Sequence, residues 1–204
     1  DRNQDVGKRL EGMPLARLYG SREFWGLDFD LNSETLDPRP DTEVLVEVAL
    51  KRFKNAAPKR FADLGTGSGC IAIALLTEWP ESQCVAIDLS HEALGQAQKN
   101  AQRHGVDDRI EFLHGSWLEP ANGTFDLIVS NPPYITNQDL ESLSPEVKNH
   151  DPIPALKGGE DGLQAYKEIF LQLDPHLNSC GRVLLEIGYN QSESVMRLSE
   201  DSGF

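Results

Sequence analysis

Short apolar runs and amphipathic stretches alternate over most of the chain. Runs typical of strands that are buried on both faces occur at residues 60–64, 83–88, 109–113, 125–129 and 182–187. Apolar positions recur at helical spacing in residues 43–53, 70–79, 90–104, 163–177 and 192–202. Strands and helices that alternate in this way predict an α/β fold with a doubly wound, mostly parallel sheet.

The pattern divides the chain into three segments. Residues 1–22 are polar with few apolar positions, and we interpret them as the end of a helix and a linker. Residues 23–42 have β-like character, and residues 43–204 contain the strand–helix alternation. The chain does not begin with Met, and residues 202–204 resemble the end of a helix that precedes another strand. We therefore expect a fragment of a longer protein that lacks its last strands.

A β-hairpin is predicted within residues 23–42. Two β-like stretches, 23–31 and 35–36, are separated by the turn-forming pair Asn32-Ser33. The Pro-Arg-Pro loop that follows is stiffened by its prolines. Asp41 or Thr42 is then expected to cap the next helix.

Composition limits the class of protein. The 204 residues suffice for one sizeable core, and no apolar run approaches the roughly 18 residues of a membrane span. No signal peptide is visible. The three cysteines, Cys70, Cys84 and Cys180, lack metal-ligand spacing, so we expect buried thiols, no metal site and a cytoplasmic location.

The chain is strongly acidic, with a formal net charge of −14. Such a surface repels phosphate backbones, and no run of Lys and Arg offsets it, so direct nucleic-acid binding is not expected. The alternative is that the acidity only favours solubility.

A glycine-rich turn follows the strand predicted at residues 60–64. It consists of Gly65, Thr66, Gly67, Ser68 and Gly69, and it leads directly into a predicted helix. Missing Cβ atoms let a ligand lie against the backbone, and the helix N-terminus offers free N–H groups. The spacing is neither that of a P-loop nor the Gly-x-Gly-x-x-Gly that favours a pyrophosphate, so it favours a nucleoside cofactor such as S-adenosylmethionine.

Asp88 ends the next predicted strand, nineteen residues after Gly69. This is close to the spacing of about 20 residues expected for an acid that binds ribose hydroxyls. Two structural alternatives stay open: the glycines form only a turn, and Asp88 only caps the helix near Ser90.

Asn131, Pro132, Pro133 and Tyr134 follow the strand predicted at residues 125–129. The prolines fix φ and donate no hydrogen bonds, so the carbonyls of Asn131 and Pro132 are held rigidly. With the Asn131 side-chain oxygen and the Tyr134 ring, they suit a planar group that carries an NH2, such as an amide or a base amine. A Pro-Pro turn without chemistry is the alternative.

Two further features lie beyond strand ends. Trp117 follows the strand predicted at residues 109–113, where an aromatic ring is often a core residue. Residues 135–162 form a long, mostly polar segment with several prolines, and we interpret it as a loop that faces the substrate.

These motifs together resemble a known family. The glycine turn, Asp88 and Asn131-Pro132-Pro133-Tyr134 resemble the class I S-adenosylmethionine-dependent methyltransferases that act on a planar nitrogen, which have a Rossmann-like fold. From about Pro14 to Phe204 the chain is similar to the HemK/PrmC family of protein-(glutamine-N5) methyltransferases, which modify peptide chain release factors. The additional motifs that carry this similarity are residues 22–26, 38–43, 144–147 and 158–162. Asp37 departs from the pattern, since an apolar residue is usual there.

The resemblance implies a role for individual residues. Residues 65–69 would line S-adenosylmethionine, Asp88 would hold its ribose and Trp117 would lie by its adenine, with Asn131 as a further residue that contacts the cofactor. Asn131 to Tyr134 would hold the substrate glutamine, with Asn131, Pro132 and Tyr134 as the catalytic residues. Residues 1–22 would be the remnant of an N-terminal helical domain.

The implied activity is methylation of the glutamine amide nitrogen N5 in the Gly-Gly-Gln motif of class I release factors, by a monomer. The alternatives are adenine-N6 methylation of nucleic acid, glutamine methylation of a ribosomal protein, and a binding module without catalysis. The roles of three residues stay open. Asp63 either reaches the amino group of the cofactor or binds the loop backbone. Arg39 either orients the substrate loop or contacts the partner, or it forms a surface ion pair, and Glu186 is interpreted as structural.

Overall fold

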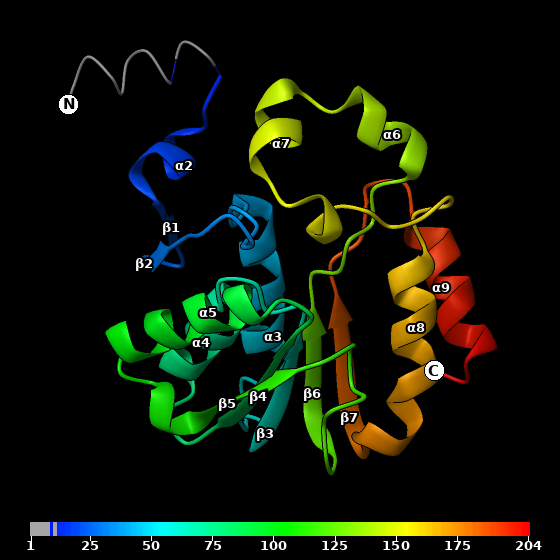
Figure 1. Ribbon diagram of the computed structural model, residues 1–204. Coiled ribbons are helices and arrows are strands. Elements are labelled where there is room, and N and C mark those ends of the chain that lie inside the picture. Colours follow the sequence, from blue (N-terminus) through cyan, green and yellow to red (C-terminus); the bar gives the residue numbers. More distant parts are fainter. Residues whose placement is uncertain (1–8, 10–11) are drawn as a thin grey trace.

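The computed structural model describes Arg9 and residues 12–204 (Figure 1). The predicted helical remnant at residues 1–22 therefore lies partly outside the described residues. Within the described part, α2 (Leu15–Tyr19) is a short helix that ends at Gly20, whose φ of 67° is readily adopted by glycine.

The predicted hairpin is present, but its turn lies elsewhere. Strands β1 (Ser21–Phe24) and β2 (Leu27–Asp30) pair antiparallel around Trp25 and Gly26, whose φ angles are 55° and 69°. Two positive φ angles are typical of the tight hairpin turns that match strand twist. Asn32, the predicted turn, instead accepts a hydrogen bond from Glu34 N at 3.0 Å through its side chain. The sequence prediction was wrong here because the whole hairpin fits within residues 21–30.

A five-stranded parallel sheet forms the centre of the protein, in the order β5-β4-β3-β6-β7. This confirms the predicted parallel, Rossmann-like sheet. Its strands are β3 (Arg60–Leu64), β4 (Gln83–Asp88), β5 (Ile110–His114), β6 (Phe125–Ser130) and β7 (Leu177–Leu185).

Helices cover both faces of this sheet. On one face lie α3 (Glu43–Arg52), α4 (Cys70–Glu78) and α5 (His91–Arg103), while α8 (Gln164–Leu173) and α9 (Ser192–Asp201) lie on the other (Figure 1). Each face of the sheet has its own hydrophobic core. Along β3, Phe61 packs into the core on the side of α3, α4 and α5, and Ala62 and Leu64 pack into the core on the side of α8 and α9. Burial on both faces explains why the strands appear in the sequence as apolar runs.

Two predictions differ from the structure near β7. The helix predicted to extend to residue 177 ends at Leu173, since a 3-10 turn, η4 (Asp174–His176), contains Pro175, which cannot continue the α-helical hydrogen bonds. β7 accordingly begins at Leu177 rather than at residue 182. Cys70 and Cys84 are buried as expected, but Cys180 is exposed because β7 is an edge strand of the sheet.

Residues 135–162 lie beyond the carboxyl ends of β6 and β7 (Figure 1). They contain α6 (Asn137–Ser142), α7 (Pro145–His150) and the short 3-10 helix η3 (Ile153–Ala155). The other short elements are η1 (Pro40–Thr42), which precedes α3, and η2 (Asp107–Arg109), which precedes β5. Within the described part of the chain, no helix has the length and apolar character needed to cross a membrane.

Strand register brings the predicted site residues to one edge of the sheet. Leu64 at the end of β3 pairs with Ser130 at the end of β6, and Ser130 pairs with Leu185 of β7. Ser130 Oγ also donates to the Leu64 carbonyl at 2.6 Å. The strand order reverses between β3 and β6, and such a switch point is where open α/β sheets bind ligands.

Candidate active site

A cavity of about 470 Å³ opens at this edge of the sheet. Gly65, Gly67, Asp88, Trp117 and Asn131 line it, together with Pro133, so most of the predicted site comes together there. The outer wall of the cavity has two parts, Glu34 and Leu36 on one segment and Pro152, Pro154 and Ala155 on another.

The glycine turn has the backbone that its sequence predicts. Gly65, Gly67 and Gly69 have φ angles of 67°, 56° and 82°. A Cβ on Gly69 would lie 3.0 Å from Ile73 Cδ1, so this glycine also permits close helix packing. Thr66 and Ser68 are buried, and with Gly69 they lie off the cavity lining. Their assignment to the cofactor stays a prediction.

Asp63 binds the glycine turn from beneath. Its Oδ2 accepts hydrogen bonds from Thr66 Oγ1 at 2.7 Å and from Ala72 N at 3.3 Å. Complete burial raises the pKa of Asp63 to about 7, although both hydrogen bonds favour the charged form. Asp63 therefore contacts the loop through the Thr66 hydroxyl and the backbone of α4 at Ala72, and its proposed contact with the cofactor stays a prediction.

Asp88 joins the glycine turn to the start of α5. Its Oδ2 accepts from Gly67 N at 2.8 Å and its Oδ1 from Ser90 N at 2.9 Å. The helix cap is Ser90 itself, whose Oγ accepts from Ala93 N at 3.2 Å. Burial raises the pKa of Asp88, while hydrogen bonds from Ser90 and Gly67 favour its charged form. Asp88 is thus a cavity carboxylate held by backbone donors, and its remaining lone pairs are suited to hydroxyl groups.

Trp117 lies beside the glycine turn in a strained conformation. Its φ is 51°, which is uncommon for a large residue. Its Nε1 donates to Glu168 Oε2 of α8 at 2.7 Å, and a Cβ on Gly65 would lie 3.9 Å from its ring. Glu168 therefore fixes the indole against the cavity, a contact that sequence reasoning missed because the two residues are far apart in the chain.

Asn131 is held by an unpredicted partner. Its Nδ2 donates to Thr42 Oγ1 at 3.1 Å. Thr42 is buried and precedes α3, but its side chain forms no cap, so the capping prediction was wrong for this residue. Within the described residues, no hydrogen bond reaches Asn131 Oδ1 or the Pro132 carbonyl. Two acceptors of the Asn-Pro-Pro-Tyr turn therefore have no partner among the described residues.

Residues 156–162 support the Asn-Pro-Pro-Tyr turn from behind. Ile135 N donates to Leu156 O at 3.0 Å, and Gly158 N donates to Ile135 O at 2.8 Å. A Cβ on Gly158 would lie 2.8 Å from the backbone of Tyr134, so only glycine allows this approach. Gln191 Nε2 holds the Tyr134 carbonyl at 3.1 Å from the other side.

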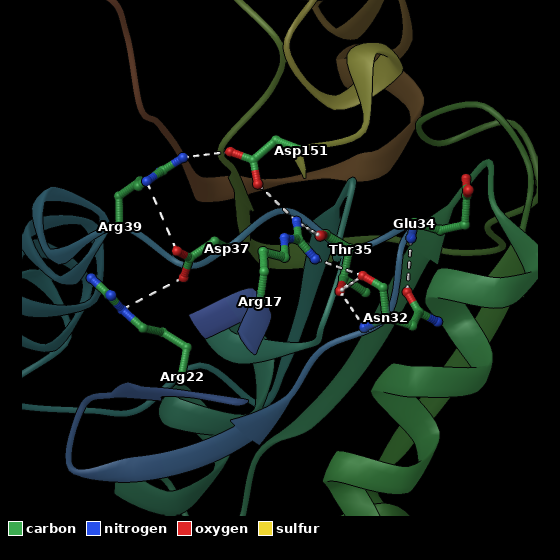
Figure 2. Close-up of polar contacts among 8 residues, drawn as sticks. All are labelled: Arg17, Arg22, Asn32, Glu34, Thr35, Asp37, Arg39 and Asp151. Carbon is green, nitrogen blue, oxygen red and sulfur yellow. Dashed lines mark hydrogen bonds and ion pairs between the residues drawn. The ribbon is translucent and has the colours of Figure 1, made fainter. Parts of the chain in front are cut away.

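Asp151 connects both parts of the outer wall (Figure 2). Its Oδ1 accepts from Arg17 Nη2 at 2.7 Å and its Oδ2 from Arg39 Nη2 at 2.5 Å. Arg17 also donates to the carbonyls of Asn32 and Thr35, at 2.7 Å and 2.6 Å. One buried carboxylate thus joins residues 32–36 to residues 152–155 across the cavity. Arg39 thus forms an ion pair, and its partner belongs to residues 135–162, the segment predicted to face the substrate.

Asp37, the departure from the family pattern, belongs to the same cluster (Figure 2). It lies 3.6 Å from Arg22 and 3.9 Å from Arg39, and burial raises its pKa while these two cations lower it. The charged residue is therefore accommodated by neighbouring arginines rather than by apolar packing. Among the described residues, no group of three or more His, Cys, Asp or Glu side chains could hold a metal ion.

Comparison with known proteins agrees with this geometry. Residues 39–145 match the family described as "Methyltransferase small domain". The chain is 46% identical over 203 residues to the release factor glutamine methyltransferase of Agrobacterium fabrum, covering 98% of this chain and 70% of that protein. It is 45% identical over 200 residues to the protein of the same name from Geobacter sulfurreducens, covering 98% and 69%.

A solved structure shows the same fold. A methyltransferase from Pyrococcus furiosus superposes with a TM-score of 0.65 at 19% identity, covering 99% of this chain and 87% of that one. At this identity the likeness concerns the fold alone. The identity to the curated relatives over nearly the whole chain is decisive, and the chain belongs to the release factor glutamine methyltransferase family.

Proposed function

We propose that the chain transfers a methyl group from S-adenosylmethionine to the side-chain amide N5 of the glutamine in the Gly-Gly-Gln motif of class I release factors. Family membership supports the reaction class. The observation that carries the proposal is the orientation of the Asn131 side-chain amide. Its NH2 group is engaged by Thr42, so its oxygen is available with the Pro132 carbonyl as a pair of acceptors for one amide NH2.

The cavity suits the cofactor. It combines a glycine backbone without side chains, a carboxylate at Asp88 and an indole at Trp117, which match a sugar with two hydroxyls and a flat base. S-adenosylmethionine supplies an electrophilic methyl group on a sulfonium. Gly65 and Gly67 would lie against it, Asp88 would accept from its ribose and Trp117 would lie against its adenine.

In this proposal, Asn131, Pro132 and Tyr134 lower the barrier by orienting the substrate amide. An amide nitrogen is a poor nucleophile because its lone pair is shared with the carbonyl. Asn131 Oδ1 and Pro132 O accept hydrogen bonds from its two N–H groups, fix the direction of the nitrogen and stabilise the positive charge that develops on it. The N–CH3 bond would form as the S–CH3 bond breaks with S-adenosylhomocysteine as the leaving group, and the methylated nitrogen would then lose one of its protons to solvent. Tyr134 packs against the amide plane. Orientation of this kind can lower a barrier by roughly 7–11 kcal/mol in favourable cases.

Asn131→Ala tests this mechanism. We expect methylation of a purified release factor to be abolished while affinity for S-adenosylmethionine, measured by calorimetry, stays nearly unchanged. Asp88→Ala should instead weaken the affinity for S-adenosylmethionine. A variant Asn131→Ala that keeps most of its activity would contradict the assigned role.

Mass spectrometry of the methylated product separates the remaining functions. Wild-type protein is incubated with labelled S-adenosylmethionine and, in separate reactions, with a release factor, a ribosomal protein fraction or duplex DNA. We expect the label on the Gly-Gly-Gln peptide alone. Methylated adenine would establish the rival function, against which the net charge of −14 argues. A monomer in the cytoplasm is part of the same proposal.

A further inference from the structure

Glu186 lies immediately beyond β7, beside the catalytic turn. Its backbone N donates to the Ser130 carbonyl at 3.0 Å, and the preceding residue, Leu185, pairs in register with Ser130. Because Ser130 directly precedes Asn131, the sheet itself fixes the position of this glutamate relative to the turn.

The carboxylate of Glu186 is incompletely paired. Tyr134 Oη donates to its Oε1 at 3.4 Å. Its Oε2 is buried and has no hydrogen-bond partner among the residues that the structure describes. Burial raises the pKa of Glu186, whereas the nearby polar side chains of Thr42, Tyr134 and Asn131 lower it. A buried acceptor without a donor is costly, so its presence next to a reactive turn requires a reason.

Thr42 has a hydroxyl near Glu186 that is not used as a donor in any hydrogen bond among the described residues. Its oxygen already accepts a hydrogen from Asn131 Nδ2 at 3.1 Å, so its own hydroxyl hydrogen is directed elsewhere. Glu186 is the carboxylate near this hydroxyl, and an ionised carboxylate can only accept. A threonine hydroxyl that accepts from Asn131 can still donate its own hydrogen, and Glu186 Oε2 is a buried acceptor without a donor. The three side chains can therefore form a series that runs from Asn131 through Thr42 to Glu186.

We propose that Glu186 and Thr42 are positioning residues that fix the orientation of the Asn131 side-chain amide. A carboxylate at the end of the series forces the threonine hydroxyl to accept from Asn131, which keeps Nδ2 on the protein side and Oδ1 towards the substrate. This inference rests on the proposed function, in which Asn131 Oδ1 accepts a hydrogen of the substrate amide.

Glu186→Gln removes this directionality with little change in shape. A glutamine can donate as well as accept, so Thr42 is free to donate to Asn131 and the Asn131 amide can rotate. A rotated Asn131 would present NH2 to the NH2 of the substrate, which is repulsive. We expect kcat to fall by at least about 10-fold, with KM for the release factor and Kd for S-adenosylmethionine changed by no more than about twofold.

Substitutions of Thr42 provide a second route to the same test. Thr42→Val removes the hydroxyl while keeping the side-chain shape, and we expect the same loss of kcat. Thr42→Ser keeps the hydroxyl and should restore activity. The double variant Glu186→Gln/Thr42→Val should lose no more than either single variant, because both break one series. Glu193→Gln, at an exposed position of α9, is the control for loss of one negative charge.

A spectroscopic measurement makes the test independent of the substrate. The side-chain ¹⁵N–¹H signals of Asn131, assigned with Asn131→Asp, should shift in Glu186→Gln and in Thr42→Val but not in Thr42→Ser or Glu193→Gln. Melting temperatures identify any variant that fails to fold, and the Thr42 pair then decides the result.

Three outcomes overturn the inference: Asn131 signals that do not move, wild-type kcat in Thr42→Val, or losses that add in the double variant. A wild-type chain that methylates no release factor would instead overturn the proposed function, while the NMR result would still decide the role of Glu186.

Discussion

Asp151→Asn is the most direct test of how the outer wall of the cofactor cavity is held. The side chains of Asp151 and Arg17 are only 3% and 9% exposed, and Asp151 also pairs with Arg39. Asparagine has nearly the same shape but no charge, so the substitution leaves two guanidinium groups without their shared counter-ion.

The expected magnitude follows from burial. Breaking a buried ion pair by removing one partner costs about 3–5 kcal/mol, since the remaining charge stays desolvated. The asparagine oxygen can still accept one hydrogen bond, and Arg39 is 40% exposed, so we expect the low end, about 3 kcal/mol of unfolding free energy. Residues 152–155 follow Asp151 directly, and Pro152, Pro154 and Ala155 line the cavity. Their release should speed dissociation of S-adenosylhomocysteine by at least about 10-fold, or ~1.4 kcal/mol.

Two measurements check this reasoning. Urea unfolding followed by tryptophan fluorescence gives the loss of stability, and stopped-flow displacement of S-adenosylhomocysteine gives the dissociation rate. Glu146→Gln is the matched control, because it removes a carboxylate whose pair with Arg9 is exposed at 48% and 45%. Such a pair contributes about 0–1 kcal/mol. If Asp151→Asn behaves like Glu146→Gln in both measurements, the proposed link between the ion cluster and the cavity is refuted.

Three further predictions concern other parts of the site. Trp117→Ala should weaken S-adenosylmethionine binding in calorimetry, and an unchanged affinity would remove the indole from the site. Gly158→Ala should reduce methylation strongly, because its Cβ would lie 2.8 Å from the backbone of Tyr134, whereas Gly95→Ala in α5 meets nothing within 4 Å and should leave activity intact. The pKa of Asp63 is about 7 in the folded protein against an ordinary 3.8, so the folded state retains a proton that the unfolded state loses, and stability should fall as pH rises from about 4 to 7. Asp63→Asn should remove this component, up to about 1.4 kcal/mol per pH unit, from the slope of unfolding free energy against pH; equal slopes in the two proteins would contradict the assignment.

The parallel sheet was predictable because its strands are buried on both faces and therefore appear as uninterrupted apolar runs. β3 and β4 have the predicted limits, and the glycine turn, Asp88 and Asn131 meet at one edge because parallel strands align their carboxyl ends. Where local signals compete, prediction was less successful. Asn32 has turn chemistry but follows the hairpin, while the actual turn at Trp25 uses a positive φ that a tryptophan gives no reason to expect.

Partners that are distant in the chain could not be predicted from spacing. Thr42 and Asn131 are 89 residues apart, and Arg17 and Asp151 are 134 apart. Only the folded structure shows that a hydrogen bond joins the first pair and that the second pair connects the two parts of the outer wall. The same holds for Glu168, which looks like an ordinary helix-surface residue until its contact with Trp117 is seen.

The boundary between β3 and β6, where Leu64 pairs with Ser130, divides the site into two halves that different elements support. Gly65, Asp88 and Trp117, which are assigned to the nucleoside, follow β3, β4 and β5, whereas the residues assigned to the recipient nitrogen follow β6 and rest on residues 156–162. Mutations in the half that follows β6 should therefore alter which macromolecule is modified while leaving the binding of the methyl donor intact. A descendant of this chain could acquire a new target through a few loop exchanges, and directed evolution aimed at new acceptors should concentrate its libraries there.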